Sequence, residues 1–290
     1  MVKTIVEQLA TFSKDLVSFI PPGLFISISA AFIEGGNYMQ AFRSEFVGTL
    51  LMIVCTFSAG KWIGKESVRM AWTSHAMGVI TADYLGGGPM VNPAVTVSMW
   101  SLGKCSYTEA YVRIAAQLGG GLVAFPVFHA VSVAMEWEPF GGPEFNTGSD
   151  QFATAEAFLS EFFATVLLLF VIYAVNWEFN FGSYHYIIKQ TLTAVAIRAL
   201  IEYFPTAGPA MNPMLATCWY VFGVGKKYEY PTEFEHYFVY WVAPFAAAIV
   251  ASVVYAIYNG DKIFGFTLPF GPLKGKTAEP ETPAFKKKKA

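Results

Sequence analysis

The stretch Gly88-Pro89-Met90-Val91-Asn92-Pro93 recurs in the second half of the chain as Gly208-Pro209-Ala210-Met211-Asn212-Pro213. Each copy opens a short apolar segment, 92–102 and 212–222. Such a segment is about half the roughly 20 residues that a helix needs to cross a bilayer. Asn is a preferred N-cap, and Pro is preferred at the first helical position because its missing N–H is not needed there. The repeated stretch therefore predicts two short helices that begin inside a membrane.

The composition also indicates an integral membrane protein. Of the 290 residues, 54% are hydrophobic and only 14% are charged, whereas soluble domains carry about 25% charged residues. Residues 236–258 contain no Asp, Glu, Lys or Arg, and residues 152–177 contain only two acids. Both segments are long enough to span a bilayer.

Six apolar segments of this kind are expected to span the membrane, three in each half of the chain. They are 44–60, 68–86, 107–135, 152–177, 185–204 and 236–258. Because each half crosses the membrane an odd number of times, the second copy of the repeat must be inverted. The sequence thus predicts an all-α membrane protein with six transmembrane helices plus two half-helices in an inverted repeat.

Four regions follow from this organisation. They are an amphipathic N-terminal segment (1–43), a first repeat (44–135), a second inverted repeat (152–258) and a lysine-rich tail (259–290). Loop 136–151 holds four acids and no Lys or Arg, whereas the tail holds seven lysines. The positive-inside rule then places both termini in the cytoplasm.

The last four lysines, Lys286 to Lys289, support two interpretations. Lys287 and Lys288 match a dilysine signal, which would retain the protein in the endoplasmic reticulum or another internal membrane. Alternatively, the lysines bind anionic lipid, a contribution of about 1 kcal/mol per Lys near the surface. Both interpretations remain open at this point.

The half-helices suggest a pore for neutral solutes. Their positive dipole ends would meet at the membrane midplane, where the Asn92 and Asn212 amides supply donors and the preceding carbonyls supply acceptors. A neutral hydroxylic molecule satisfies both kinds of group, but a cation faces two positive helix ends. The expected function is passage of small neutral solutes with exclusion of protons and other cations.

Residues 44–258 resemble the major intrinsic protein (aquaporin) family. Met214, Leu215 and the lysine-rich tail together resemble its unorthodox, intracellular branch, which includes the superaquaporins and the small basic intrinsic proteins. The resemblance implies a pore midplane formed by two motifs, Asn92-Pro93-Ala94 and the altered Asn212-Pro213-Met214. It also implies that Glu45 and Glu161 are buried acids that orient the half-helix loops. A homotetramer with one pore per subunit is expected on the same basis.

The family's outer constriction is altered in this chain. Members usually carry Arg three residues after the second Asn, where this chain has Leu215. The other constriction positions then fall at Trp72, Leu200 and Pro209, and an insertion in the loop after span 5 would move Leu200 to Ile197. The constriction is therefore expected to be apolar.

The remaining polar groups of the spans are interpreted as structural. Arg198 and Glu202 are interpreted as an i,i+4 ion pair, which lies on the opposite face if Leu200 faces the pore. The alternative is that Arg198 supplies the charge that the constriction lacks. Arg69 and Asp83 are interpreted as snorkelling residues near the ends of span 2. No metal site, cofactor, catalytic residue or nucleic-acid partner is expected, so the partners are membrane lipid and the solute.

Three functions are compatible with these features. The leading one is a passive channel for water, glycerol or hydrogen peroxide. Met214, Leu215 and bulky Trp72 motivate the alternative of a non-conducting relative that serves assembly. An alternating-access transporter is less favoured, since beyond Glu45 and Glu161 no polar cluster at the midplane could hold a coupling ion.

Overall fold

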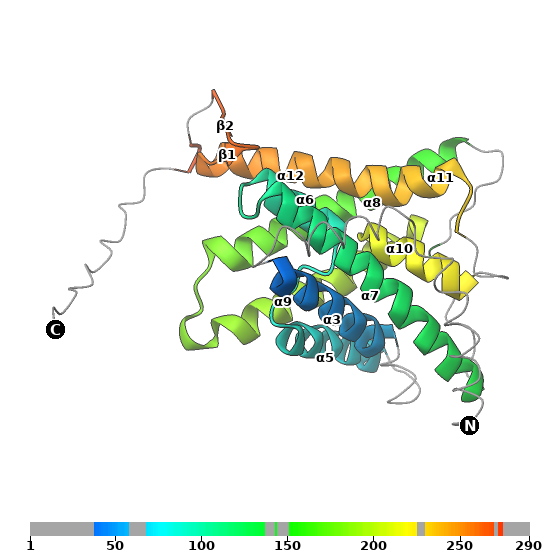
Figure 1. The fold of residues 1–290 in the computed structure, drawn as a ribbon. Helices are drawn as coiled ribbons and strands as arrows, with labels where there is room; N and C mark the ends of the chain where they lie inside the picture. The colour runs from blue at the N-terminus through cyan, green and yellow to red at the C-terminus, as the bar shows by residue number, and fades with distance from the viewer. Residues whose placement is uncertain are drawn as a thin grey trace.

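The computed structural model describes residues 38–57, 68–136, 143, 151–224, 230–269 and 272–274. Most of the N-terminal segment, most of the acidic loop and the C-terminal lysines lie outside these residues. The described part is a bundle of helices (Figure 1) with one short hairpin, β1 (Lys262–Ile263) and β2 (Phe266–Thr267), after the last helix.

The first half of the bundle contains three long helices and one half-helix. These are α3 (Tyr38–Phe57), α5 (Val68–Gly86), α6 (Pro93–Ser101) and α7 (Tyr107–Ala134). The long helices pack as a group, with α3 against both α5 and α7. Helix α6 is the first half-helix, and it begins at the Pro that the sequence predicts.

The second half repeats this order. Its main helices are α8 (Gln151–Tyr173), α9 (His185–Tyr203), α10 (Pro213–Trp219) and α12 (Ala243–Asn259). Short helical turns extend or connect them: η1 (Ala174–Glu178), η2 (Gly182–Tyr184), η3 (Pro205–Ala207), η4 (Tyr220–Val224), α11 (Phe234–Tyr237) and η5 (Phe238–Val242). The turns η1, η4 and η5 are π-helical.

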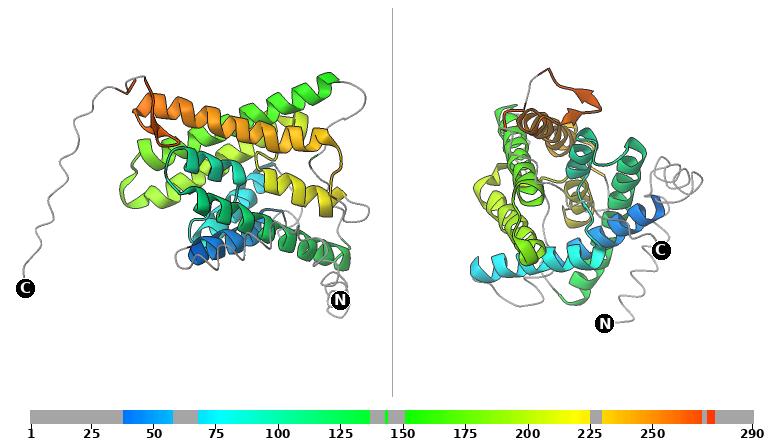
Figure 2. Two further views of the ribbon diagram at one scale, coloured as in Figure 1. Left: turned by 45° about the horizontal axis from the view of Figure 1, so that its top comes forward. Right: turned by 90° about the vertical axis from the view of Figure 1, so that its left-hand side faces the viewer.

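Each half-helix packs against the opposite half of the bundle. Helix α6 contacts α12 as well as its own neighbour α7, and α10 contacts α7. Figure 1 shows α6 and α10 between α12 on one side and α3 and α5 on the other, and Figure 2 shows α10 (yellow) inside the bundle from two further sides. The two halves therefore interlock.

The last span is continuous despite a proline near its middle. Pro244 has no N–H to donate to the preceding turn, which would break an ordinary α-helix. The π-helical turn Phe238–Val242 lies directly before it and accommodates the missing bond. As a result, Phe234–Asn259 forms one apolar helix long enough to cross a membrane.

Among the described residues, two further segments meet the same criterion of length and apolar composition, Tyr107–Val131 and Ala153–Glu178. Helices α5 and α9 have 19 residues each and are less apolar. They carry polar side chains such as Asp83 and Lys189 on the face that lines an internal cavity. The predicted all-α membrane fold is confirmed, and the weaker hydropathy of α5 and α9 reflects their place at the cavity wall.

Candidate pore

The two Asn-Pro motifs start their half-helices by side-chain capping. Asn92 Oδ1 accepts a hydrogen bond from the Ala94 N–H at 2.8 Å, and Asn212 Oδ1 accepts from the Leu215 N–H at 3.2 Å. In each case Pro occupies the first helical turn. Because the amide oxygen serves as the cap, the NH₂ group of each Asn remains available for other contacts.

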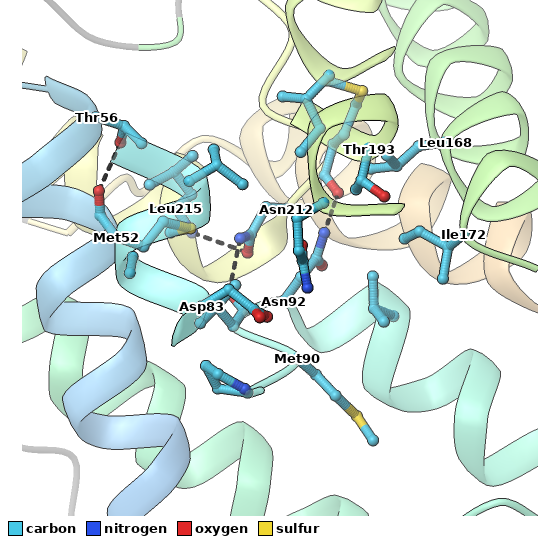
Figure 3. Close-up of a pocket in the computed structure, with 18 of the residues that line it drawn as sticks. Met52, Thr56, Asp83, Met90, Asn92, Leu168, Ile172, Thr193, Asn212 and Leu215 are labelled. Carbon is cyan, nitrogen blue, oxygen red and sulfur yellow. Dashed lines mark hydrogen bonds between the residues drawn. The ribbon is translucent and has the colours of Figure 1, made fainter. Parts of the chain in front are cut away.

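One N–H of each amide joins the two half-helices to each other. Asn92 Nδ2 donates to the Met211 carbonyl at 2.7 Å, and Asn212 Nδ2 donates to the Val91 carbonyl at 2.9 Å. Figure 3 shows the two amides close together in the middle of the labelled side chains. The start of each half-helix is therefore fixed by the other half of the chain.

The two accepting carbonyls belong to residues with unusual backbone conformations. Val91 has φ 51° and Met211 has φ 50°. This left-handed region is uncommon for non-Gly residues and unfavourable for a β-branched one such as Val. Strain of this kind persists only where the surroundings hold it in place, and it gathers at functional sites.

Two buried carboxylates hold these strained residues. Glu45 accepts from the N–H groups of Met90 and Val91 at 2.9 and 2.8 Å. Glu161 accepts from the N–H groups of Ala210 and Met211 at 2.6 and 2.9 Å. Both acids have 0% exposure. Each carboxylate therefore supplies the hydrogen bonds that water cannot supply to the buried loop before the half-helix of the same repeat, and these bonds are strengthened by its charge.

The two acids differ in how their charge is balanced. Arg113 in α7 donates to Glu45 at 2.6 Å and also pairs with Glu109 at 2.7 Å. Glu161 makes no ion pair within the part of the chain that the structure describes. The sequence analysis did not single out Arg113, although its i,i+4 spacing from Glu109 in an apolar helix is a signal that could have found it.

A long cavity of about 790 Å³ passes the two asparagines. Its lining on α9 extends from Tyr186 to Ile201, which at 1.5 Å per residue is about 22 Å of helix. On α5 the lining extends from His75 to Asp83. We call its two ends the Arg198 end, which includes His75, and the Lys189 end, which includes Asp83. A cavity of this length covers most of a hydrocarbon core of about 30 Å.

The six residues expected at the pore midplane differ in whether they line the cavity. Asn92 and Asn212 line the cavity, but the other four motif residues, Pro93, Ala94, Pro213 and Met214, do not. Ala94 and Met214 are fully buried in packing clusters instead.

The substituted Met214 packs against α7. A Cβ added at Gly121 would lie 2.6 Å from Met214 Sδ, so the absent side chain of this glycine makes room for the larger residue. The side chain of Met214 is therefore not part of the cavity wall. The wall is instead formed by the next residue, Leu215.

The expected constriction is also partly corrected. Pro209 and Leu215 line the cavity, whereas Trp72 and Leu200 do not. Leu200 packs with Leu168 and Met211 in a buried cluster, and Ile197 lines the cavity in its place. This is the position expected if the loop after α9 carries an insertion, and the 3₁₀ turn Pro205–Ala207 lies in that loop.

Arg198 lies at the cavity wall, in agreement with the alternative interpretation of this residue. The predicted ion pair with Glu202 is present, with Arg198 Nη2 at 3.1 Å from the carboxylate. Because Leu200 faces away from the cavity, Arg198 lines it beside Ile197 and Ile201.

Asp83 at the other end also lines the cavity and is not a snorkelling residue. The hydroxyl of Tyr186 donates to its carboxylate at 2.7 Å. Lys189 lies at the same end and donates to Asn176 Oδ1 at 3.1 Å. The Lys189 end is thus polar and carries charges of both signs.

These features define a class of membrane channel in which two half-helices meet, N-terminus to N-terminus, at the wall of one long cavity. A family model described as "Major intrinsic protein" matches residues 32–255. The chain therefore belongs to the major intrinsic protein family, as the resemblance of its motifs predicts.

Several individual proteins are similar to this chain in sequence or in structure. The chain is 29% identical to "Aquaglyceroporin-2" of Rhizophagus irregularis, with 80% of this chain and 83% of the relative covered. It is 28% identical to "Aquaporin-2" of Rattus norvegicus, with 75% and 78% covered. The X-ray structure of the aquaglyceroporin from Plasmodium falciparum shares the fold, with a TM-score of 0.60 at 21% identity over 76% of this chain and 96% of that one. These findings support the predicted class, a passive channel for water and small neutral solutes.

Proposed function

We propose that this protein conducts water and small neutral solutes, with glycerol as the model solute, along the cavity and excludes protons and other cations. The observation that carries the proposal is the orientation of the Asn92 and Asn212 amides. Both line the cavity, and both use their oxygen as a helix cap. They therefore present only N–H donors to a solute between them.

This donor-only centre explains passage of neutral molecules. Each amide has two N–H groups, and one of them is used in the bond to the opposite half-helix. The second can donate to a water or hydroxyl oxygen in the cavity. A water held by both asparagines must direct its own hydrogens toward its neighbours on either side.

The same arrangement opposes ion flow. Proton transfer along a chain of waters requires each water to accept a hydrogen bond from one neighbouring water and to donate one to the next. The central water donates hydrogen bonds to both neighbouring waters, so it interrupts this transfer. A metal cation at this point would face the positive ends of the two half-helices in a poorly polarisable wall. Apolar side chains such as Val95, Leu168 and Leu215 form much of that wall, so a desolvated ion finds little compensation.

A swelling assay tests the function. Purified protein in liposomes is challenged with sorbitol and glycerol gradients, and the rates are compared with those of empty liposomes. Acceleration of water or glycerol flux supports the channel. If neither flux rises, the channel is excluded and the non-conducting alternative stands. Dependence of solute flux on a sodium or proton gradient would instead indicate a transporter.

We further propose a homotetramer in an internal membrane, with four regions (1–43, 44–135, 152–258 and 259–290) and both termini in the cytoplasm. Charge distribution supports the orientation, because lysines concentrate in the tail and acids in the loop after span 3. An exposed apolar stripe on α8, formed by Leu159, Phe163 and Leu167, suits contact with lipid or another subunit. Cross-linking in the membrane tests the oligomer, and replacement of Lys287 and Lys288 by Ser tests retention by the tail.

A further inference from the structure

Two polar side chains at the Arg198 end of the cavity have buried atoms without a protein partner. These atoms are Arg198 Nε and His75 Nδ1, and neither has a hydrogen-bond partner within the described residues. Both side chains line the same end of the cavity. A buried donor or acceptor left unpaired costs about 1–3 kcal/mol, so both atoms favour a partner that occupies the cavity.

The guanidinium group of Arg198 is bound at its Nη2 atom by the carboxylate of Glu202. Glu202 Oε1 accepts from Arg198 Nη2 at 3.1 Å and from the indole N–H of Trp72 at 2.8 Å. This shared carboxylate oxygen restrains the tip of the Arg198 side chain and leaves Nε as a free donor. Trp72 thus acts through Glu202 and is not part of the cavity wall.

The surrounding wall offers few other groups for solute recognition. Ile197, Ile201, Pro209 and Leu215 are apolar neighbours in the lining. The hydroxyl of Thr56 donates to the Met52 carbonyl of its own helix at 2.7 Å. Discrimination between solutes at this end therefore depends mainly on Arg198 and His75.

We propose that Arg198 and His75 form the solute-selecting site of the pore, with specificity for small neutral molecules that carry adjacent hydroxyl groups. Arg198 Nε donates to one hydroxyl oxygen, and His75 Nδ1 accepts from the neighbouring hydroxyl. The fixed guanidinium charge also opposes entry of cations. This inference rests on the proposed channel function. It places the polar filter on α5 and α9, because the α10 position is occupied by Leu215.

Two substitutions of Arg198 separate hydrogen bonding from charge. Arg198→Leu removes both, whereas Arg198→Lys keeps a cation and lacks the Nε donor. The matched control is Arg69→Leu, since Arg69 is an exposed residue of the same end of α5 and does not line the cavity. Each variant is reconstituted in liposomes, and fluxes of water, glycerol, 1,3-propanediol and potassium are measured.

The wild type is expected to prefer glycerol, with its adjacent hydroxyls, over 1,3-propanediol. Loss of a hydrogen bond to a charged group should reduce this preference about tenfold in both Arg198 variants. Potassium leak should rise in Arg198→Leu and stay at the wild-type level in Arg198→Lys. His75→Phe should lose the glycerol preference without a potassium leak, which tests the site even where Arg198→Leu does not fold.

The inference is overturned if the Arg198 and His75 variants keep the wild-type ratio of glycerol to 1,3-propanediol flux. It is also overturned if Arg69→Leu changes that ratio equally, because the effect would then not belong to the cavity. Failure of the channel function itself is distinguishable, since it appears as absence of flux through the wild type.

Discussion

Asn92 of the first half and Met211 of the second are joined by a hydrogen bond of 2.7 Å from the Asn92 amide to the Met211 carbonyl. The reciprocal bond runs from Asn212 to Val91. The centre of the pore is therefore a contact between the two halves of the chain, and neither half can build it alone. Substitutions at this contact should affect stability as well as flux.

Asn92→Ala should destabilise the protein by about 2 kcal/mol, because it removes a helix cap and the bond to Met211, each worth about 1 kcal/mol. The measurement is the midpoint of thermal unfolding in detergent. Thr193→Val is the control, since Thr193 also lines the cavity but its hydroxyl donates to the Lys189 carbonyl of its own helix. An equal shift for both variants would contradict the role given to Asn92.

Gly121→Ala should destabilise the protein by about 1–3 kcal/mol through overpacking, because the added Cβ would lie 2.6 Å from Met214 Sδ and 2.8 Å from Cys218 Sγ. Gly119→Ala is a control in the same helix, because a Cβ there would meet only the Phe46 ring at 3.4 Å, an ordinary contact. The double variant Gly121→Ala with Met214→Ala relieves the contact with Met214 but not the one with Cys218, so its loss of stability in thermal unfolding should be smaller than the sum of the two single losses. Additive losses would contradict the contact between Gly121 and Met214.

Arg113→Met should be strongly destabilising, by about 3–5 kcal/mol, because it leaves the buried Glu45 carboxylate without its cation. The double variant Arg113→Met with Glu45→Gln removes both charges and should lose less stability than Arg113→Met alone. Unfolding by heat or denaturant of the four proteins in this cycle gives the coupling energy. Additive effects would show that the ion pair is not coupled.

Leu215→Ala should change the ratio of glycerol to water permeability and Met214→Ala should not, although the two residues are adjacent. Leu215 lines the cavity, so its truncation widens the bore and should raise the ratio of glycerol to water permeability. Met214 faces α7, so its truncation should leave this ratio at the wild-type value. Both ratios are measured by liposome swelling. A changed ratio for Met214→Ala alone would reverse the assignment of the two side chains.

The helices and the family could be predicted from the sequence because their signals are local. The Asn-Pro pairs mark the starts of α6 and α10 through capping, which involves only neighbouring residues. Apolar length indicates the long helices, and the repeated motif indicates that the two halves correspond. The fold class, the family and the channel class are confirmed.

The cavity wall was predicted less well. Counting from Asn212 placed Leu200 in the constriction, or Ile197 if the intervening loop carries an insertion. The structure has Ile197 and Arg198 at the wall, which agrees with the second possibility. The count fails because it crosses the loop after α9, whose turns change the register between helix and motif. Trp72 was expected in the constriction and instead donates to Glu202 from outside the wall.

The sequence by itself determined that two half-helices exist, where each of them starts and that the two halves repeat. These properties depend on capping, proline geometry and apolar length, which act over a few residues. Only the tertiary structure decided which side chains meet: Arg113 with Glu45, Met214 with Gly121, and each Asn with a carbonyl of the other half. These contacts join residues far apart in the chain, so they depend on how the helices are rotated and packed, which local periodicity does not specify.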